Sequence, residues 1–187
     1  PHDKNVIEEV KKIEKLDDVN FKSNLDLITK IGHEVDAAYL EKIKAQSLSP
    51  DSIEKQKDIS IVYSPIHGTG VELIPRCLKE IGFQNIHLLE SQSTPNGNFP
   101  TVIYPNPEEK EALTLAIEKA KEIDAELIMA TDPDADRVGI AIKDGDGDYI
   151  LLNGNQTGSL LVYYVLSQWE KSGKFKGNEC VIKTIVT

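Results

Sequence analysis

The sequence predicts an α/β fold: a three-layer α/β/α domain with a mostly parallel sheet and an added antiparallel hairpin. Two observations lead to this prediction. β-rich runs and amphipathic stretches alternate from residue 59 to residue 130, which is typical of a parallel sheet with helices on its faces. Two further β-rich runs then flank the glycine- and aspartate-rich stretch 144–148, which indicates a hairpin.

The alternating region contains three expected strands separated by helices and loops. The strands are Ile59–Ser64, Asn85–Leu89 and Glu126–Ala130, and the helices are Val71–Ile81 and Glu108–Ile123. The turn Pro65–Gly70 lies at a helix N-terminus, where free N–H groups can bind anions, but we expect its His67 to serve the structure of the turn. The loop Glu90–Pro107 is long for a compact domain, and loops of this length are often functional.

The flanking regions are less regular. Before the alternating region we expect helices at Asn5–Asp18 and His33–Gln46, a strand at Asp26–Ile31 and a loop at Ser47–Ser52. After it we expect hairpin strands at Val138–Ile142 and Tyr149–Leu152, a helix at Gly154–Gln168 and a strand at Val181–Val186. The sequence begins without methionine and stops in a β-rich run, so we expect it to be cut from a longer protein.

Composition excludes several classes of partner. The formal net charge is −10, which repels nucleic acid and anionic membranes, so neither is an expected partner. No apolar run approaches the roughly 20 residues that span a bilayer. Cys77 and Cys180 match no zinc or redox spacing, and we expect reduced thiols in a cytoplasmic protein.

The stretch Thr131–Arg137 is the most informative part of the sequence. Asp132, Asp134 and Asp136 alternate directly after a buried-type strand, and ligands of open α/β sheets gather at the carboxyl ends of strands. Three carboxylates this close repel one another unless a cation lies between them, and Mg²⁺ prefers oxygen ligands. A guanidinium beside such a site, here Arg137, suits phosphate recognition.

Three other arrangements also place acidic residues close together in a loop. A solvated acidic turn is the simplest, and it is the one we expect for Asp144–Asp148. An EF-hand loop beginning at Asp132 requires glycine and glutamate where the chain has Arg137 and Lys143, so that motif is excluded. Asp132 and Asp134 do have the spacing of an aspartyl-phosphate phosphatase, although Asp136 departs from that pattern.

The octapeptide Ala130–Arg137 resembles the metal loop of the α-D-phosphohexomutase family, which includes phosphoglucomutases and phosphomannomutases. Three further segments are similar to parts of that family in the same order. They are the strand-to-helix turn Tyr63–Gly70, the loop residues Phe99-Pro100 with Pro105–Glu108, and Asn153–Gln156, where the third of four domains begins. The resemblance covers roughly residues 33 to 187.

The resemblance implies a domain organisation for the chain. Residues 1–33 would be the C-terminal tail of the first mutase domain, 34–152 the second domain with the metal loop, and 153–187 a truncated start of the third. The family's phosphoserine loop, its sugar-binding loop and its phosphate-binding loop do not occur in this sequence. The remaining domains of a parent enzyme are therefore expected partners.

The resemblance also implies an activity. A phosphoserine would exchange phosphoryl groups with a sugar phosphate through a bisphosphorylated sugar, converting a 1-phosphate into a 6-phosphate, with a glucose 1,6-bisphosphate-type compound as activator. Asp132, Asp134 and Asp136 would bind one Mg²⁺, and Arg137 would orient a phosphate of the sugar substrate. We expect the chain by itself to be inactive. A hydrolase with Asp132 as nucleophile and a non-catalytic cation-binding domain stay open as alternatives, and the choice of sugar is not set by these residues.

Overall fold

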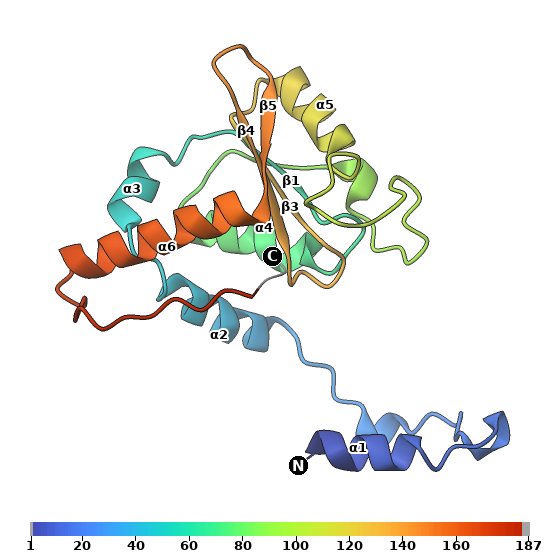
Figure 1. The fold of residues 1–187 in the computed structure, drawn as a ribbon. Coiled ribbons are helices and arrows are strands. Elements are labelled where there is room, and N and C mark those ends of the chain that lie inside the picture. The colour runs from blue at the N-terminus through green and yellow to red at the C-terminus, as the bar shows by residue number, and fades with distance from the viewer. Residues whose placement is uncertain (1, 185–187) are drawn as a thin grey trace. The chain divides into compact units, whose positions relative to one another are not determined.

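A computed structural model describes residues 2–184 of the chain in two units, of which the first ends at Val35 and the second begins at Asp36 (Figure 1). The first unit contains α1 (His2–Val10), the single 3-10 turns η1 (Leu16–Asp18) and η2 (Leu25–Leu27), and the start of α2 (His33–Lys44). Among residues 2–184, no helix combines the length and the hydropathy needed to cross a membrane.

Two predictions for the first unit were wrong. The expected helix Asn5–Asp18 ends at Val10, and the expected strand Asp26–Ile31 is a 3-10 turn in which Asn24 Oδ1 accepts the Asp26 N–H at 3.1 Å. A strand requires a neighbour that pairs its N–H and C=O groups and covers one face. The side chains here have no such cover, since Leu27 is 81% exposed.

The second unit is built on a five-stranded mixed sheet in the order β2-β1-β3-β4-β5. β1 (Ile61–Ser64) lies between β2 (Ile86–Leu88) and β3 (Leu127–Thr131), and these three strands are parallel. β4 (Val138–Lys143) and β5 (Tyr149–Leu152) continue the sheet as an antiparallel hairpin. The predicted parallel sheet with an added hairpin is therefore confirmed.

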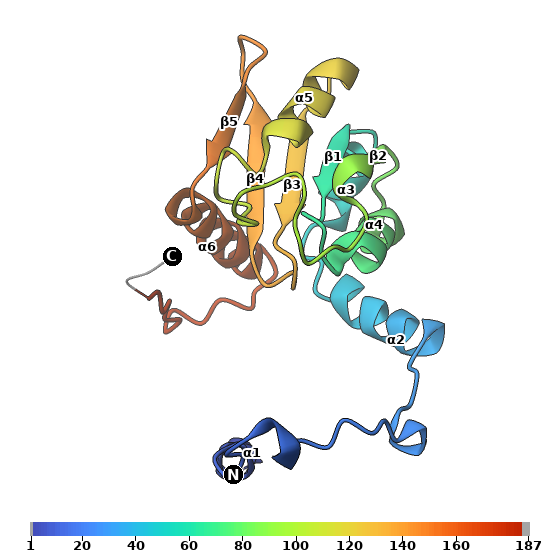
Figure 2. The same ribbon diagram turned by 90° about the vertical axis from the view of Figure 1, so that its right-hand side faces the viewer.

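Helices complete the α/β/α layers. α5 (Thr114–Ile123) lies on one face of the sheet and α6 (Gly154–Lys171) on the other (Figures 1 and 2). α4 (Gly70–Ile81) follows β1 and packs beside β2. The core between α5 and the sheet uses small side chains on the helix, which allow the backbone to approach the strands closely. The buried core residues are Val62, Ile66, Leu89, Ala112, Leu113, Ala116, Ala120, Ala125, Ile128, Ala130 and Ala141.

Several boundaries differ from the prediction. The expected loop Ser47–Ser52 contains the start of α3 (Pro50–Lys55), because proline at the first turn of a helix has no N–H to lose. α5 begins at Thr114 instead of Glu108, since Asn106 accepts the Glu108 and Glu109 N–H groups in a turn.

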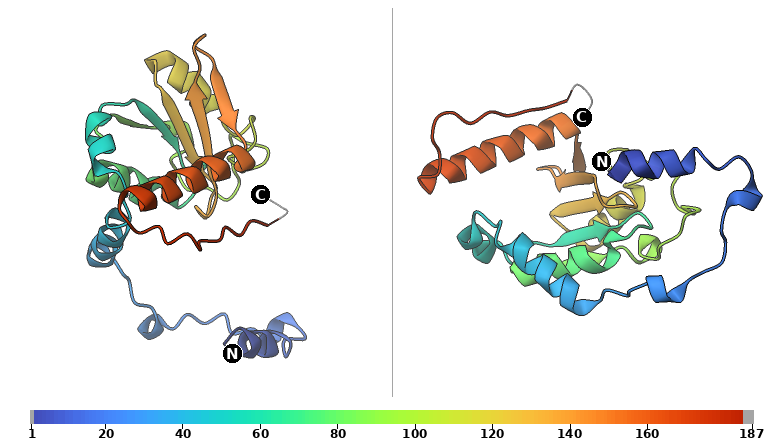
Figure 3. Two further views of the ribbon diagram at one scale, coloured as in Figure 1. Left: turned by 60° about the vertical axis from the view of Figure 1, so that its left-hand side comes forward. Right: turned by 90° about the horizontal axis from the view of Figure 1, so that it is seen from below.

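The C-terminal segment also differs. α6 runs to Lys171, past the expected end at Gln168. The chain then turns back alongside α6 (Figure 3). Val181 lines two hollows together with residues of that helix. The predicted strand Val181–Val186 is not formed in its described part, which ends at Thr184. Ile182 in this part is 91% exposed and does not pair with the sheet. Ile185 and Val186 lie outside the described residues.

A buried hydroxyl pair joins the two central strands and generates a prediction on pH. Tyr63 of β1 is fully buried, and its hydroxyl lies 2.9 Å from Thr131 Oγ1 of β3. Burial raises the pKa of Tyr63 to about 12, against the lowering effect of the hydrogen bond with Thr131. Because the folded state prefers the neutral phenol, this contribution to stability is complete below pH 10 and is lost as the pH rises from 10 to 12.

We predict that the free energy of unfolding falls more steeply between pH 10 and 12 in the natural sequence than in Tyr63→Phe. A two-unit shift corresponds to about 2.7 kcal/mol. At pH 8 the variant should be less stable by about 1 kcal/mol, because Thr131 loses its partner. Urea titrations of both proteins across this range measure the difference, in which the shared titration of lysines cancels. Parallel pH profiles would contradict the prediction.

Candidate metal centre

The three aspartates predicted as ligands lie together at the carboxyl end of β3. Asp132 directly follows the strand and is 1% exposed, whereas Asp134 and Asp136 are exposed on the loop to β4. One carboxylate oxygen from each residue lies within 4.8 Å of the others. Among residues 2–184 this is the group whose spacing suits a metal ion.

This spacing fits a small divalent cation with little adjustment. Magnesium takes oxygen ligands at 2.0–2.1 Å, so two oxygens on opposite sides of the ion lie about 4.2 Å apart. For a pair on opposite sides of the ion, a separation of up to 4.8 Å has to close by at most roughly half an ångström, which side-chain rotation of exposed Asp134 or Asp136 can supply. The donor set is also chemically suitable, since hard carboxylates suit Mg²⁺ and Mn²⁺.

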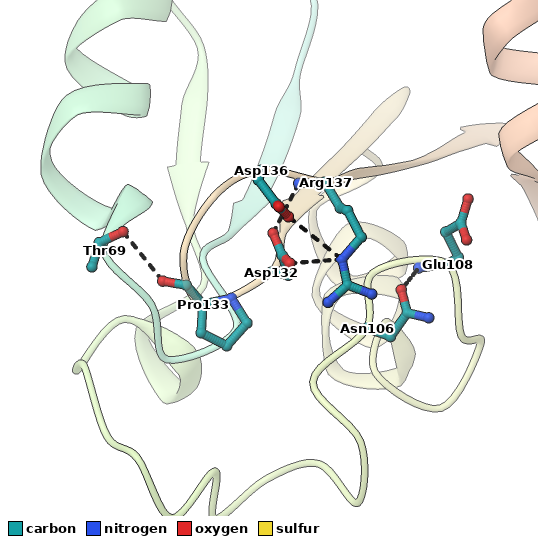
Figure 4. Close-up of polar contacts among 7 residues, drawn as sticks. All are labelled: Thr69, Asn106, Glu108, Asp132, Pro133, Asp136 and Arg137. Atoms are coloured by element: carbon teal, nitrogen blue, oxygen red, sulfur yellow. Dashed lines mark hydrogen bonds and ion pairs between the residues drawn. The ribbon is translucent and has the colours of Figure 1, made fainter. Parts of the chain in front are cut away.

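Arg137 holds Asp132 from two sides (Figure 4). Its backbone N–H donates to Asp132 Oδ1 at 2.9 Å, and its Nε donates to Oδ2 at 2.7 Å. The same Nε lies 3.6 Å from Asp136 Oδ1. Arg137 thus lies beside the aspartates, as the sequence indicates, but its contacts here are with the carboxylates. Its side chain is about half exposed, so the guanidinium also faces solvent.

The pKa shifts follow from these contacts. Burial alone raises the pKa of Asp132, but the backbone and guanidinium hydrogen bonds of Arg137 outweigh it, and the net pKa is lowered. The pKa of Asp136 is raised, first by its hydrogen-bonding contact with Asp132 and then by the negative charges of Asp134 and Asp132. The cluster therefore contains one carboxylate that its contacts stabilise as an anion, Asp132, and one that they disfavour as an anion, Asp136. A bound cation would relieve the repulsion among the three negative charges.

A second loop supports the acidic loop through its backbone. Pro133 O accepts the Thr69 N–H at 2.8 Å and the Thr69 hydroxyl at 3.2 Å (Figure 4). Gly68 lies so close that a Cβ there would be 2.3 Å from Pro133 Cα. Only glycine permits this approach. The turn after β1 and the loop after β3 therefore pack as one unit.

Sequence reasoning missed the partners that hold this turn. His67 was expected to be structural, and it is 5% exposed, with Nδ1 at 3.0 Å from Thr94 O and Nε2 at 2.9 Å from Thr101 Oγ1. Thr69 and Gln92 were not singled out by the sequence. The loop length of Glu90–Pro107 was the available signal, since that loop supplies Gln92, Thr94 and Thr101.

The other acidic cluster, Asp144–Asp148, forms the turn of the hairpin between β4 and β5. Asp144 Oδ1 accepts the N–H groups of Asp146 and Asp148, both at 2.9 Å, and Asp148 pairs with Lys121 at 2.7 Å. The carboxylates of Asp144 and Asp148 therefore have local protein partners. They lie at the opposite end of β4 from Asp136, beyond Lys143.

Fold and site together define the class: an α/β/α domain that gathers three carboxylates at the carboxyl end of its central strand. The family model for phosphoglucomutase/phosphomannomutase, alpha/beta/alpha domain II, matches residues 37–147, more than half of the chain. The chain belongs to the phosphoglucomutase/phosphomannomutase family.

Individual relatives agree with this assignment. A probable phosphomannomutase of Haemophilus influenzae is 41% identical over 140 residues, and a phosphoglucomutase of Staphylococcus haemolyticus is 46% identical over 111 residues. These matches cover 75% and 59% of this chain but only 28% and 20% of the relatives. A solved structure of a phosphoglucomutase/phosphomannomutase family protein from Burkholderia thailandensis superimposes with a TM-score of 0.56 at 28% identity, over 72% of this chain and 26% of that one.

Proposed function

We propose that this chain supplies the Mg²⁺-binding loop of a mutase that interconverts sugar 1-phosphates and 6-phosphates through a phosphoserine and a bisphosphorylated intermediate. The observation that supports this most is the convergence of Asp132, Asp134 and Asp136 within 4.8 Å in a member of this family. When bound, the ion neutralises charge on the transferring phosphoryl group.

The chain's own residues would have distinct roles at this site. Asp132 is the fixed ligand, because β3 and Arg137 determine its position before an ion arrives. Asp134 and Asp136 are exposed and complete the site by rotating inward. Arg137 would hold Asp132 through Nε while its outer N–H groups face a phosphate of the sugar.

The remaining parts of the machinery would come from other domains of a longer protein. In this proposal residues 1–33 end the first domain, 34–152 form the second, and 153–187 begin the third. The phosphoserine, the loop that grips the sugar and the loop that binds the non-reacting phosphate lie outside these residues. A cytoplasmic location and activation by a glucose 1,6-bisphosphate-type compound belong to the same proposal.

The geometry gives less support to a hydrolase with Asp132 as nucleophile. Such a carboxylate needs one free oxygen that faces the phosphorus atom. Here Asp132 is buried and both of its oxygens accept hydrogen bonds from Arg137. Those bonds suit a ligand that is held in place.

We predict that the 187-residue chain binds Mn²⁺ weakly and that Asp134→Asn raises the dissociation constant by about tenfold or more, since it removes a charged ligand without changing shape. Asp146→Asn is the matched control, because it removes the same charge from the exposed hairpin turn. The free Mn²⁺ signal in electron paramagnetic resonance measures binding by all three proteins. Equal affinity of the natural chain and Asp134→Asn would overturn the metal assignment.

A second prediction concerns turnover. The chain alone should form no glucose 6-phosphate from glucose 1-phosphate, with catalytic glucose 1,6-bisphosphate present, because it lacks the phosphoryl donor. In the longer protein that contains it, Asp134→Asn should lower kcat by about 100-fold or more, through loss of charge stabilisation in the transition state. Asp146→Asn should leave kcat near that of the natural enzyme. Turnover by the isolated chain, or full activity of Asp134→Asn, contradicts the proposal.

A further inference from the structure

A buried polar network lies next to the acidic loop and is not part of the proposed metal site. It links the end of β1 to the long loop after β2. Its members are Ser64, His67, Gln92 and Thr101, called the buried polar network below. Ser64 and Gln92 are fully buried and His67 is nearly so.

The hydrogen bonds of the network run in one direction. The Ser64 hydroxyl donates to Gln92 Oε1 at 2.5 Å, and Gln92 Nε2 donates to Thr101 Oγ1 at 3.0 Å. His67 Nδ1 faces the Thr94 carbonyl, which can only accept, so Nδ1 bears the proton. In the neutral ring, His67 Nε2 is then the acceptor for the Thr101 hydroxyl. Each group has one role, which fixes the tautomer and ring position of His67.

The turn that this network holds is strained. Ile66 has φ 45° and His67 has φ 59°, so two successive residues with side chains lie in the left-handed region. This conformation is uncommon for any residue other than glycine and an outlier for a β-branched one. A backbone conformation of this kind persists only when contacts with the surrounding residues hold it in place. The contacts here are the network, the Ile66 N–H bond to Ser64 Oγ at 3.1 Å and the His67 N–H bond to Gln92 O at 2.8 Å.

The strained turn leads directly to the acidic loop. Gly68 and Thr69 follow His67 and make the backbone contacts with Pro133 described above. Pro133 lies between Asp132 and Asp134, so the position of Pro133 determines where the backbone places Asp134 relative to Asp132. A shift of the turn therefore moves Pro133, and with it the spacing between the buried ligand and the exposed ones.

We propose that His67 and the buried polar network position the acidic loop for its cation, so that His67 is a positioning residue of the metal centre. This inference rests on the proposed function. The long loop 90–107 would thereby affect the metal centre indirectly. Gln92 and Thr101 fix the position of the His67 ring, and His67 fixes the conformation of the turn. The turn itself packs against Pro133 and hydrogen-bonds to it. Groups around metal ligands commonly affect metal affinity in this way.

Three variants of the 187-residue chain test the proposal by Mn²⁺ titration. His67→Ala removes both ring contacts and should raise the dissociation constant by about tenfold. Thr101→Val has nearly the same shape, removes only the bridging hydroxyl, and should raise it by about threefold or more. His67→Asn should restore most of the affinity lost in His67→Ala, because asparagine tolerates the left-handed region and its amide can donate to Thr94 O.

A matched control separates positioning from loss of stability. Tyr149→Phe removes one hydrogen bond, to Ala125 O, at the opposite end of the hairpin, and should leave Mn²⁺ affinity unchanged although it also destabilises the fold. In addition, hydrogen exchange of the Thr69 amide, which donates to Pro133 O, should become faster in His67→Ala and Thr101→Val but not in Tyr149→Phe.

The outcomes distinguish this inference from the proposed function. If Asp134→Asn weakens binding while His67→Ala and Thr101→Val, both folded, bind as the natural chain does, the positioning role is wrong and the metal site stands. A loss of affinity in Tyr149→Phe equal to that in Thr101→Val would also overturn positioning. If Asp134→Asn itself has no effect, the metal site fails, and the inference fails with it.

Discussion

The contact between Gly68 and Pro133 is the constraint on which the rest of the site depends. β1 and β3 are adjacent and parallel, so the loops that follow them emerge at the same edge of the sheet. They can pack together only because residue 68 has no Cβ, which would otherwise lie 2.3 Å from Pro133 Cα. The Thr69 N–H bond to Pro133 O then locks the two backbones. The acidic loop thus takes its shape from a neighbouring turn as well as from its own sequence.

The negative charges of the acidic loop explain why contacts from outside the loop are needed to keep it in this conformation. Asp132, Asp134 and Asp136 repel one another, and a free loop would relieve the repulsion by opening. The pKa of Asp136 is raised first by its hydrogen-bonding contact with Asp132 and then by the negative charges of Asp134 and Asp132. Arg137 compensates for one carboxylate, and the packing at Pro133 keeps the others within reach. In a chain with a net charge of −10, a cation at this point would also give an anionic substrate a locally favourable site.

The sequence was sufficient for the central sheet and for the acidic cluster. The strands at 61–64, 86–88 and 127–131 have local patterns that agree with their tertiary environment, and alternating aspartates after a buried strand are visible without a structure. The prediction of a strand at Asp26–Ile31 was wrong because strand formation depends on a neighbouring strand, which the local sequence pattern does not reveal. The buried polar network was missed for a related reason: Gln92 is 28 residues from Ser64, and Thr101 is 34 residues from His67. Only the fold brings them together.

The acidic loop, held by the neighbouring turn, is proposed to bind one divalent cation. Backbone amide NMR of the 187-residue chain during addition of Mn²⁺ tests it directly, since the paramagnetic ion broadens the signals of nearby residues. At less than one equivalent, the amide signals of Asp132, residues 134–137, Gly68 and Thr69 should broaden first, while those of residues 144–148 at the far end of the hairpin stay sharp. Broadening that begins at residues 144–148, or that affects the acidic surface uniformly, would contradict the account.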